Sequence, residues 1–142
     1  MSESFQLTVT KTVPASAKDL FEAWLDPKAL AQFMKPHPSM PEPRVKTDAR
    51  EGGEFEIVML AGDKELLHRG EYKTIQRYER LVFTWLSEFT LPSSVVSIDF
   101  KQLGPKQTQI TLRHEGLPNQ ESRDNHRGGW SHILDALATR VG

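Results

Sequence analysis

The last quarter of the chain constrains the fold most, because a strand pattern there gives way to one helix pattern. Residues 108–115 alternate apolar and polar side chains, which is typical of a strand with one buried face. Residues 116–119 (Gly-Leu-Pro-Asn) interrupt this pattern, and Asn119 is a good helix cap. The following helix carries one apolar stripe, formed by Trp130, Ile133, Leu134, Leu137 and Val141. These features predict a terminal helix packed on a sheet.

The rest of the chain supplies two short helices and six more strands. Residues 5–10 alternate as a strand, Ser16 caps a first helix, and Asp26 caps a second helix over about 27–33. Five further strand-like segments are 44–48, 53–60, 65–75, 81–87 and 94–103. Their tight connections predict antiparallel order, since parallel neighbours need long crossovers. The fold class is therefore α+β, with seven antiparallel strands in a single domain over residues 1–142.

Composition excludes several classes of function. The formal net charge is −1 with both signs scattered along the chain, so we expect no nucleic acid partner. The chain has no cysteine, which excludes disulfides, thiolate metal sites and a thiol nucleophile. It shows neither a secretory signal nor an apolar run of roughly 20 residues, so a cytoplasmic protein without membrane insertion is expected.

Seven segments resemble a known family, in order and over nearly the whole chain. They are 13–24 (VPASAKDLFEAW), 26–27 (DP), 48–55 (DAREGGEF), 70–72 (GEY), 79–85 (ERLVFTW), 111–117 (TLRHEGL) and 126–130 (HRGGW). The chain resembles the START-like superfamily, also called Bet v 1-like, helix-grip or SRPBCC. More narrowly, it resembles the bacterial family named after the C-terminal domain of the activator of heat-shock protein 90 ATPase.

This resemblance implies a curved seven-stranded antiparallel sheet wrapped on a long C-terminal helix, with two short helices after the first strand. It also implies a cavity between sheet and helix, where relatives hold lipids, sterols, polyketides or plant hormones. Phe33 stands where relatives often carry tryptophan, which would alter the mouth of that cavity.

Three histidines fall in registers that could face the interior, namely His68, His114 and His126. Each could be a hydrogen-bonded structural residue, a polar contact for a ligand or a metal ligand. Their spacing matches no recognised metal motif, so we expect neither a metal nor a cofactor.

No catalytic constellation emerges from the pattern. Glu54 and Glu56 alternate away from the buried face of their strand and should lie in water. Ser94 and its neighbours lack a nucleophile motif and an evident base partner. We therefore predict no catalytic residues, and whether the chain is an enzyme stays open.

The aromatic residues favour a binding protein. Side chains from separate elements share inward registers, and a pocket lined by apolar groups with a few polar ones is the usual form of a small-molecule site. The predicted lining is Phe33, Phe55, Met59, His68, Tyr72, Phe83, Trp85, His114, His126 and Trp130.

The preferred function is binding of a hydrophobic or aromatic, lipid- or polyketide-like molecule. A first alternative is an interaction module that regulates a heat-shock protein 90 type chaperone or a stress response, through charged segments 64–65 and 76–80. A second alternative is a pocket enzyme, such as a cyclase or hydrolase. We expect a monomer or a weak homodimer, paired through a sheet edge near the first or last strand.

Overall fold

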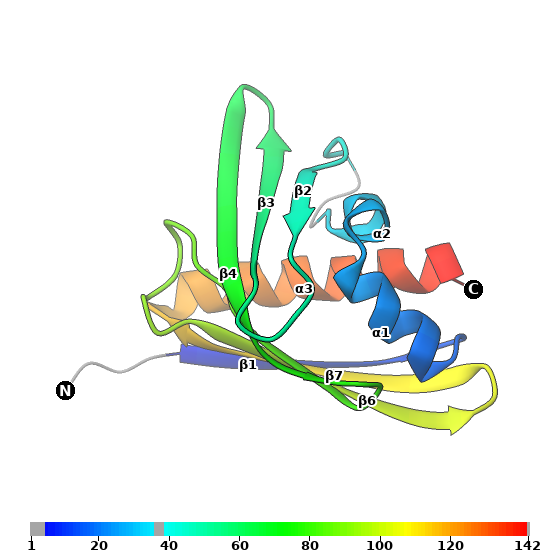
Figure 1. Cartoon of the computed structure of the whole chain (residues 1–142). Coiled ribbons are helices and arrows are strands. Elements are labelled where there is room, and N and C mark those ends of the chain that lie inside the picture. Colours follow the sequence, from blue (N-terminus) through cyan, green and yellow to red (C-terminus); the bar gives the residue numbers. More distant parts are fainter. Residues whose placement is uncertain (1–4, 36–38, 142) are drawn as a thin grey trace.

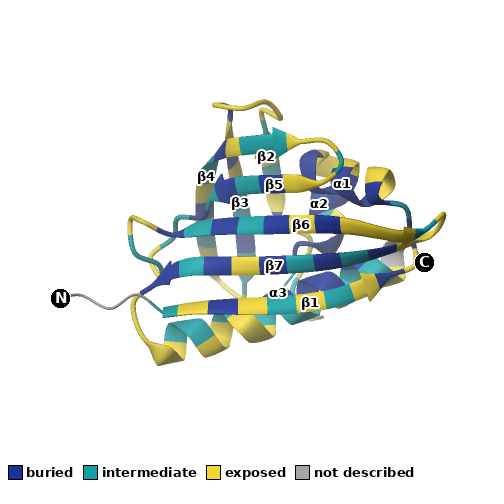
Figure 2. Ribbon diagram, turned by 90° about the horizontal axis from the view of Figure 1, so that it is seen from below, coloured by how far each residue is buried: buried dark blue, intermediate teal, exposed yellow. Residues whose placement is uncertain are grey.

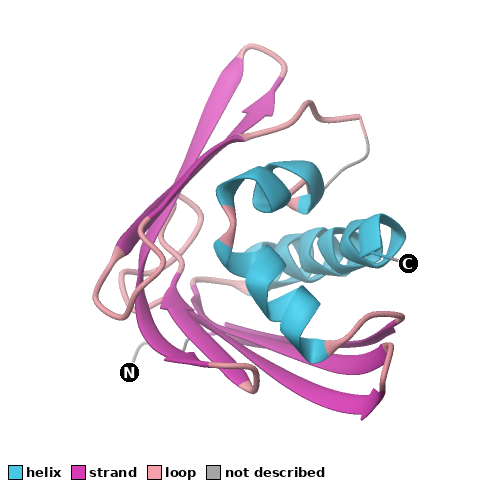
Figure 3. Cartoon of the chain, turned by 45° about the vertical axis from the view of Figure 1, so that its right-hand side comes forward, coloured by secondary structure: helices cyan, strands magenta, loops and turns pink. Residues whose placement is uncertain are grey.

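The computed structural model describes residues 5–35 and 39–141. Within them, seven strands form one bent antiparallel sheet and three helices lie on its concave face (Figures 1 and 3). The strands are β1 (Phe5–Val13), β2 (Arg44–Thr47), β3 (Glu54–Ala61), β4 (Lys64–Gln76), β5 (Arg80–Thr84), β6 (Val95–Gly104) and β7 (Gln107–Leu117). The helices are α1 (Ala17–Leu25), α2 (Pro27–Phe33) and α3 (Gln120–Val141). The predicted helix-grip architecture is confirmed.

The strand order is β1-β7-β6-β5-β4-β3-β2, so every neighbour but the β1–β7 pair is also a neighbour along the chain. The edges are β1 and β2, whereas β7 pairs on both sides. Of the two edges expected, at the first or the last strand, the structure has the one at the first strand, and the last strand lies inside the sheet. Pairing between β1 and β7 joins the two ends of the chain, and no local sequence pattern reports such a contact.

The sheet bends along β4, the long strand that rises away from β1, β6 and β7 in Figure 1. The first part of β4 pairs with β3 up to Glu71, and the remainder pairs with β5 from Tyr72 onward. Gly70 lies at this change of partner. A Cβ there would stand 1.9 Å from the carbonyl oxygen of Thr84 and 2.7 Å from the Phe55 ring. Glycine at this position thus permits the close approach of β4 to Thr84 and Phe55.

Capping residues set the starts of the helices. The Ser16 side chain accepts a hydrogen bond from the Asp19 amide at 3.2 Å, and the Asp26 carboxylate accepts one from the Lys28 amide at 3.1 Å. Pro27 occupies the first turn of α2, where its missing N–H costs nothing. At the third helix, the Asn119 side chain accepts from the Ser122 amide at 2.8 Å. All three predicted caps are confirmed.

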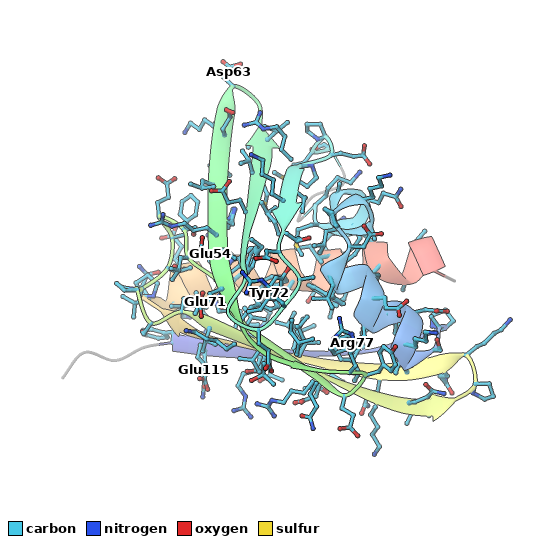
Figure 4. All side chains as sticks on the ribbon, in the orientation of Figure 1. Glu54, Asp63, Glu71, Tyr72, Arg77 and Glu115 are labelled. Carbon is cyan, nitrogen blue, oxygen red and sulfur yellow. The ribbon has the colours of Figure 1, made fainter. Side chains whose placement is uncertain are left out.

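One hydrophobic core joins the sheet to the helices, and burial alternates along the strands as Figure 2 shows. The stripe on α3 is buried at Trp130, Ile133, Leu134 and Leu137, while the side chain of Val141 lies outside the described residues. Glu54 and Glu56 are exposed, as predicted. Figure 4 shows Asp63 at the tip of the β3–β4 hairpin and Glu115 beneath the sheet.

Among residues 5–35 and 39–141, no helix combines the length and the apolarity needed to cross a membrane.

Candidate functional site

A cavity of about 500 Å³ opens beside the N-terminal half of α3. Its walls come from β3, β4, the segment after β5, the turn before α3, and α3 itself. The lining residues are Met59, Leu66, His68, Trp85, Glu88, Phe89, Pro118, Asn119, Glu121, Ser122, Asn125, His126, Gly129, Trp130 and Ile133. Apolar groups and a few polar groups share these walls, which is the usual make-up of a small-molecule pocket.

The helix wall of the cavity follows from helical periodicity. Seven lining residues lie on one stripe of α3, as neighbours or three to four positions apart. They are Glu121, Ser122, Asn125, His126, Gly129, Trp130 and Ile133. Gly129 stands in the middle of this stripe, where any side chain would project into the cavity. The adjacent Gly128 is exposed, and a Cβ there would meet no atom within 4 Å. Gly129 therefore borders the cavity, whereas Gly128 faces open space.

A buried hydrogen-bond network lies behind this wall. The indole Nε1 of Trp130 donates to Nδ1 of His114 at 3.0 Å, and Nε2 of His114 lies 2.7 Å from Oγ of Ser94. His114 and Ser94 are fully buried. The chain turn that carries Ser94 approaches β7 closely at Gly116, which has a φ of +87° and where a Cβ would stand 2.5 Å from the Ser94 Cα. The network thus ties α3, β7 and the start of β6 together.

Ser94 has a histidine partner after all, which corrects the sequence-based view that it has none. The arrangement is nevertheless unsuited to nucleophilic catalysis. Since an indole can only donate, Nδ1 of His114 must be unprotonated, and its proton sits on Nε2 and points at Ser94. A catalytic serine needs the opposite tautomer, in which Nε2 accepts its proton. Burial lowers the pKa of His114 to about 3, with smaller contributions from His126 and His68, so the ring is neutral at pH 7.

The other two interior histidines hold the alternative tautomer. His68 places Nδ1 3.1 Å from the carbonyl oxygen of Leu66, and His126 places Nδ1 2.7 Å from the carbonyl oxygen of Ser122. A carbonyl can only accept, so each Nδ1 carries the proton. Burial lowers the pKa of His68 to about 4 and also lowers the pKa of His126. Both rings are therefore neutral at pH 7. The His126 ring has an unprotonated Nε2, whereas the His68 ring also has the Ile57 carbonyl as a hydrogen-bond partner.

The structure brings half of the predicted lining residues to the cavity. Met59, His68, Trp85, His126 and Trp130 line it. Three others, Phe55, Tyr72 and Phe83, surround a separate hollow of about 10 Å³ that Trp85 also borders. Phe33 packs edge-on against Trp24 with 5.2 Å between ring centres. His114 lies behind Trp130 in the network described above.

The remaining lining residues were not singled out from the sequence. They are Leu66, Glu88, Phe89, Pro118, Asn119, Glu121, Ser122, Asn125 and Gly129, together with Ile133, which had been assigned only to the core. Most of them lie in turns or on the polar half of the α3 stripe. The polar half of the α3 stripe was detectable from the sequence. His126 and Ser122 lie four and eight positions before Trp130, which places them on the same helix face.

The cavity lining contains two carboxylates, Glu88 and Glu121, and no lysine or arginine. Both carboxylates are exposed. Inside, the indole N–H of Trp85 is buried without a hydrogen-bond partner among the described residues. No cluster of three His, Asp or Glu side chains in that part of the chain could hold a metal ion. The polar groups of the site are therefore suited to hydrogen bonding.

Solved structures with the same fold come from several bacteria. A protein from Chromobacterium violaceum has 24% identity, a TM-score of 0.83, and coverage of 96% of this chain and 97% of its own. A Staphylococcus aureus protein of unknown function has 19% identity, a TM-score of 0.80, and coverage of 98% and 94%. CalU16 from Micromonospora echinospora has 22% identity, a TM-score of 0.73, and coverage of 99% and 78%. At these identities the likeness concerns the fold alone.

No curated protein matched the chain. One family pattern did match, that of the Activator of Hsp90 ATPase homolog 1-like proteins, and it covers residues 14–142. This span includes all elements from α1 to α3 and most of the segments on which the resemblance was based. The chain therefore belongs to the family of Activator of Hsp90 ATPase homolog 1-like proteins.

Proposed function

We propose that this protein binds a small, largely apolar or aromatic molecule in the cavity beside α3. The observation that carries the proposal is the cavity itself, about 500 Å³ in volume and walled by Met59, Trp85, Trp130 and Ile133. Small-molecule pockets typically measure roughly 300–1,000 Å³.

Two features of the walls support a specific guest. The rings of Trp85 and Trp130 lie 4.9 Å apart at 58°, so they form a continuous aromatic corner. His114 holds Trp130 in place through its indole N–H. A rigid aromatic wall loses little side-chain entropy on binding, which raises affinity for flat apolar molecules.

Binding is expected to change tryptophan fluorescence, because two of the three tryptophans line the cavity. It should also raise the melting temperature. A ligand at a hundred times its Kd stabilises the folded state by about 2.7 kcal/mol, which corresponds to roughly 5–10 °C for a chain of this length. A screen of lipids, flavonoids and polyketide-like compounds, followed by both signals, tests the proposal. Absence of both signals across the screen would count against it.

Filling the cavity should abolish binding. Gly129→Leu places a side chain in the middle of the α3 stripe, and we expect affinity for any ligand found in the screen to fall at least tenfold. Gly128→Leu is the matched control, because it raises helix propensity by the same amount but points into open space. Titration calorimetry on both variants measures the effect. Equal affinities in the two variants would place the ligand elsewhere.

The family name supports a second candidate, contact with a chaperone of the heat-shock protein 90 type. The charged segments 64–65 and 76–80 would supply this contact, and Lys64, Glu65, Arg77 and Arg80 in them are exposed. If this function holds, Lys64→Glu combined with Arg77→Glu should weaken binding to a purified bacterial chaperone of that type, measured by biolayer interferometry. The cavity-filled Gly129→Leu variant should bind it normally. Unchanged chaperone binding by the double glutamate variant would count against contact through these segments.

A further inference from the structure

The tautomers of the lining histidines determine whether their ring nitrogens donate or accept hydrogen bonds in the cavity. His126 turns Nδ1–H back to the Ser122 carbonyl of its own helix at 2.7 Å. Its second nitrogen, Nε2, therefore lies on the far side of the ring and can only accept a hydrogen bond. No described residue donates to it.

His68 lines the same cavity from β4. Its Nδ1–H is directed to the Leu66 carbonyl, the Ile57 carbonyl is a further hydrogen-bond partner, and its ring packs against Trp85 with 4.9 Å between ring centres at 32°. Both histidines line the cavity and stay neutral at pH 7, because burial lowers the pKa of each. His126 therefore contributes one acceptor nitrogen, Nε2, to the lining of the cavity.

The charged side chains that border the cavity are all negative. Glu88 and Glu121 border the cavity, and no described residue forms an ion pair with either of them. The lining has no lysine or arginine that could offset them. An anionic guest would meet two like charges and no cation, while a neutral or cationic guest would not be repelled.

We propose that the cavity selects aromatic molecules that are neutral or cationic and that carry a hydroxyl or amine donating a hydrogen bond to Nε2 of His126, and that it rejects carboxylates. This inference rests on the proposed function and narrows it to one class of ligand. Fatty acids and aromatic acids fall outside the class even though their apolar parts would fit.

A series built on one biphenyl core tests the selection. The probes are 4-phenylphenol, 4-methoxybiphenyl, 4-(aminomethyl)biphenyl and biphenyl-4-carboxylate, which differ only in the polar group at one end. The phenol and the amine are expected to bind about three- to tenfold more tightly than the methoxy compound, the range that one net hydrogen bond provides. The carboxylate is expected to bind at least tenfold more weakly than the phenol. Titration calorimetry at pH 7 measures all four.

Variants of His126, Glu88 and Glu121 test whether these residues cause the selection among the four probes. His126→Phe should reduce the preference for the phenol over the methoxy compound to about onefold while the methoxy compound still binds. Replacement of both mouth acids, Glu88→Gln with Glu121→Gln, should strengthen carboxylate binding several-fold. The control with the same change in net charge is Glu54→Gln with Glu56→Gln, on the outer face of β3, and it should leave carboxylate binding unchanged.

The possible results distinguish a failure of this inference from a failure of the proposed function on which it rests. If the methoxy compound or the carboxylate binds as tightly as the phenol, the cavity binds apolar molecules but the selection is wrong. If His126→Phe keeps the phenol preference, the hydrogen bond goes elsewhere and the role of His126 is wrong. If none of the four probes binds, and the wider screen also gives no ligand, the small-molecule function itself fails.

Discussion

Replacement of His114 by phenylalanine is expected to lower the free energy of unfolding by about 3 kcal/mol at pH 7. The variant removes the acceptor of the Trp130 indole N–H and the partner of the Ser94 hydroxyl, both of which are buried. An orphaned buried polar group costs about 1–3 kcal/mol, and two are created here. Urea denaturation followed by circular dichroism gives the difference.

The control for this variant is the double variant His114→Phe with Ser94→Ala. It removes one of the two orphaned groups, so about 1 kcal/mol of stability should return. A His114→Phe variant as stable as the parent would mean that the network contributes nothing to folding.

The same histidine should give a characteristic dependence on pH. Its pKa is about 3 in the folded protein, against 6.5 as the ordinary value. Below pH 6.5 His114 is protonated in the unfolded chain but stays neutral in the folded chain. The free energy of unfolding therefore decreases as the pH falls. Between pH 7 and pH 5 this loss amounts to about 2 kcal/mol. Phenylalanine cannot titrate, so the gap between parent and variant should narrow from about 3 kcal/mol at pH 7 to about 1 kcal/mol at pH 5. A gap that stays constant would contradict the neutral, desolvated state of His114.

Gly70→Ala should also have a large effect, with a loss of about 3 kcal/mol or more. The new methyl group would stand 1.9 Å from the Thr84 carbonyl oxygen and 2.7 Å from the Phe55 ring, so β4 and β5 would have to separate. Gly104→Ala is the matched control, because the nearest atom to its Cβ is the Gln107 side chain at 3.9 Å. That control should change stability by less than about 1 kcal/mol. Thermal and urea unfolding of both variants test this, and equal losses would show that the approach at Gly70 is not tight.

Short sequence patterns were sufficient to predict the helices and strands of this fold. Ser16 and Asp26 predicted the starts of α1 and α2, because helix caps depend on a few adjacent residues. The Ser94–His114 contact could not be predicted in this way. Its residues are 20 positions apart on neighbouring segments, and only the pairing of β6 with β7 brings them together.

The candidate site was predictable only in part, for a related reason. Alternation shows that Phe55, Phe83 and Trp85 face inward, and all three are buried. It does not show which inward side chains fill the core and which border a cavity. That distinction depends on how sharply the sheet bends at Gly70 and on where α3 crosses it. Trp85 reaches the cavity, while Phe55 and Phe83 pack around the small hollow next to it.

Trp130 donates its indole N–H to His114 inside the protein and borders the cavity with the small part of its ring that stays accessible. An indole anchored through its nitrogen cannot swing when a neighbouring space is occupied. Any spectral response of this residue would then report direct contact with the occupant, with little contribution from motion of the wall. The fluorescence of Trp130 can therefore be used to follow the kinetics of ligand binding without an added label.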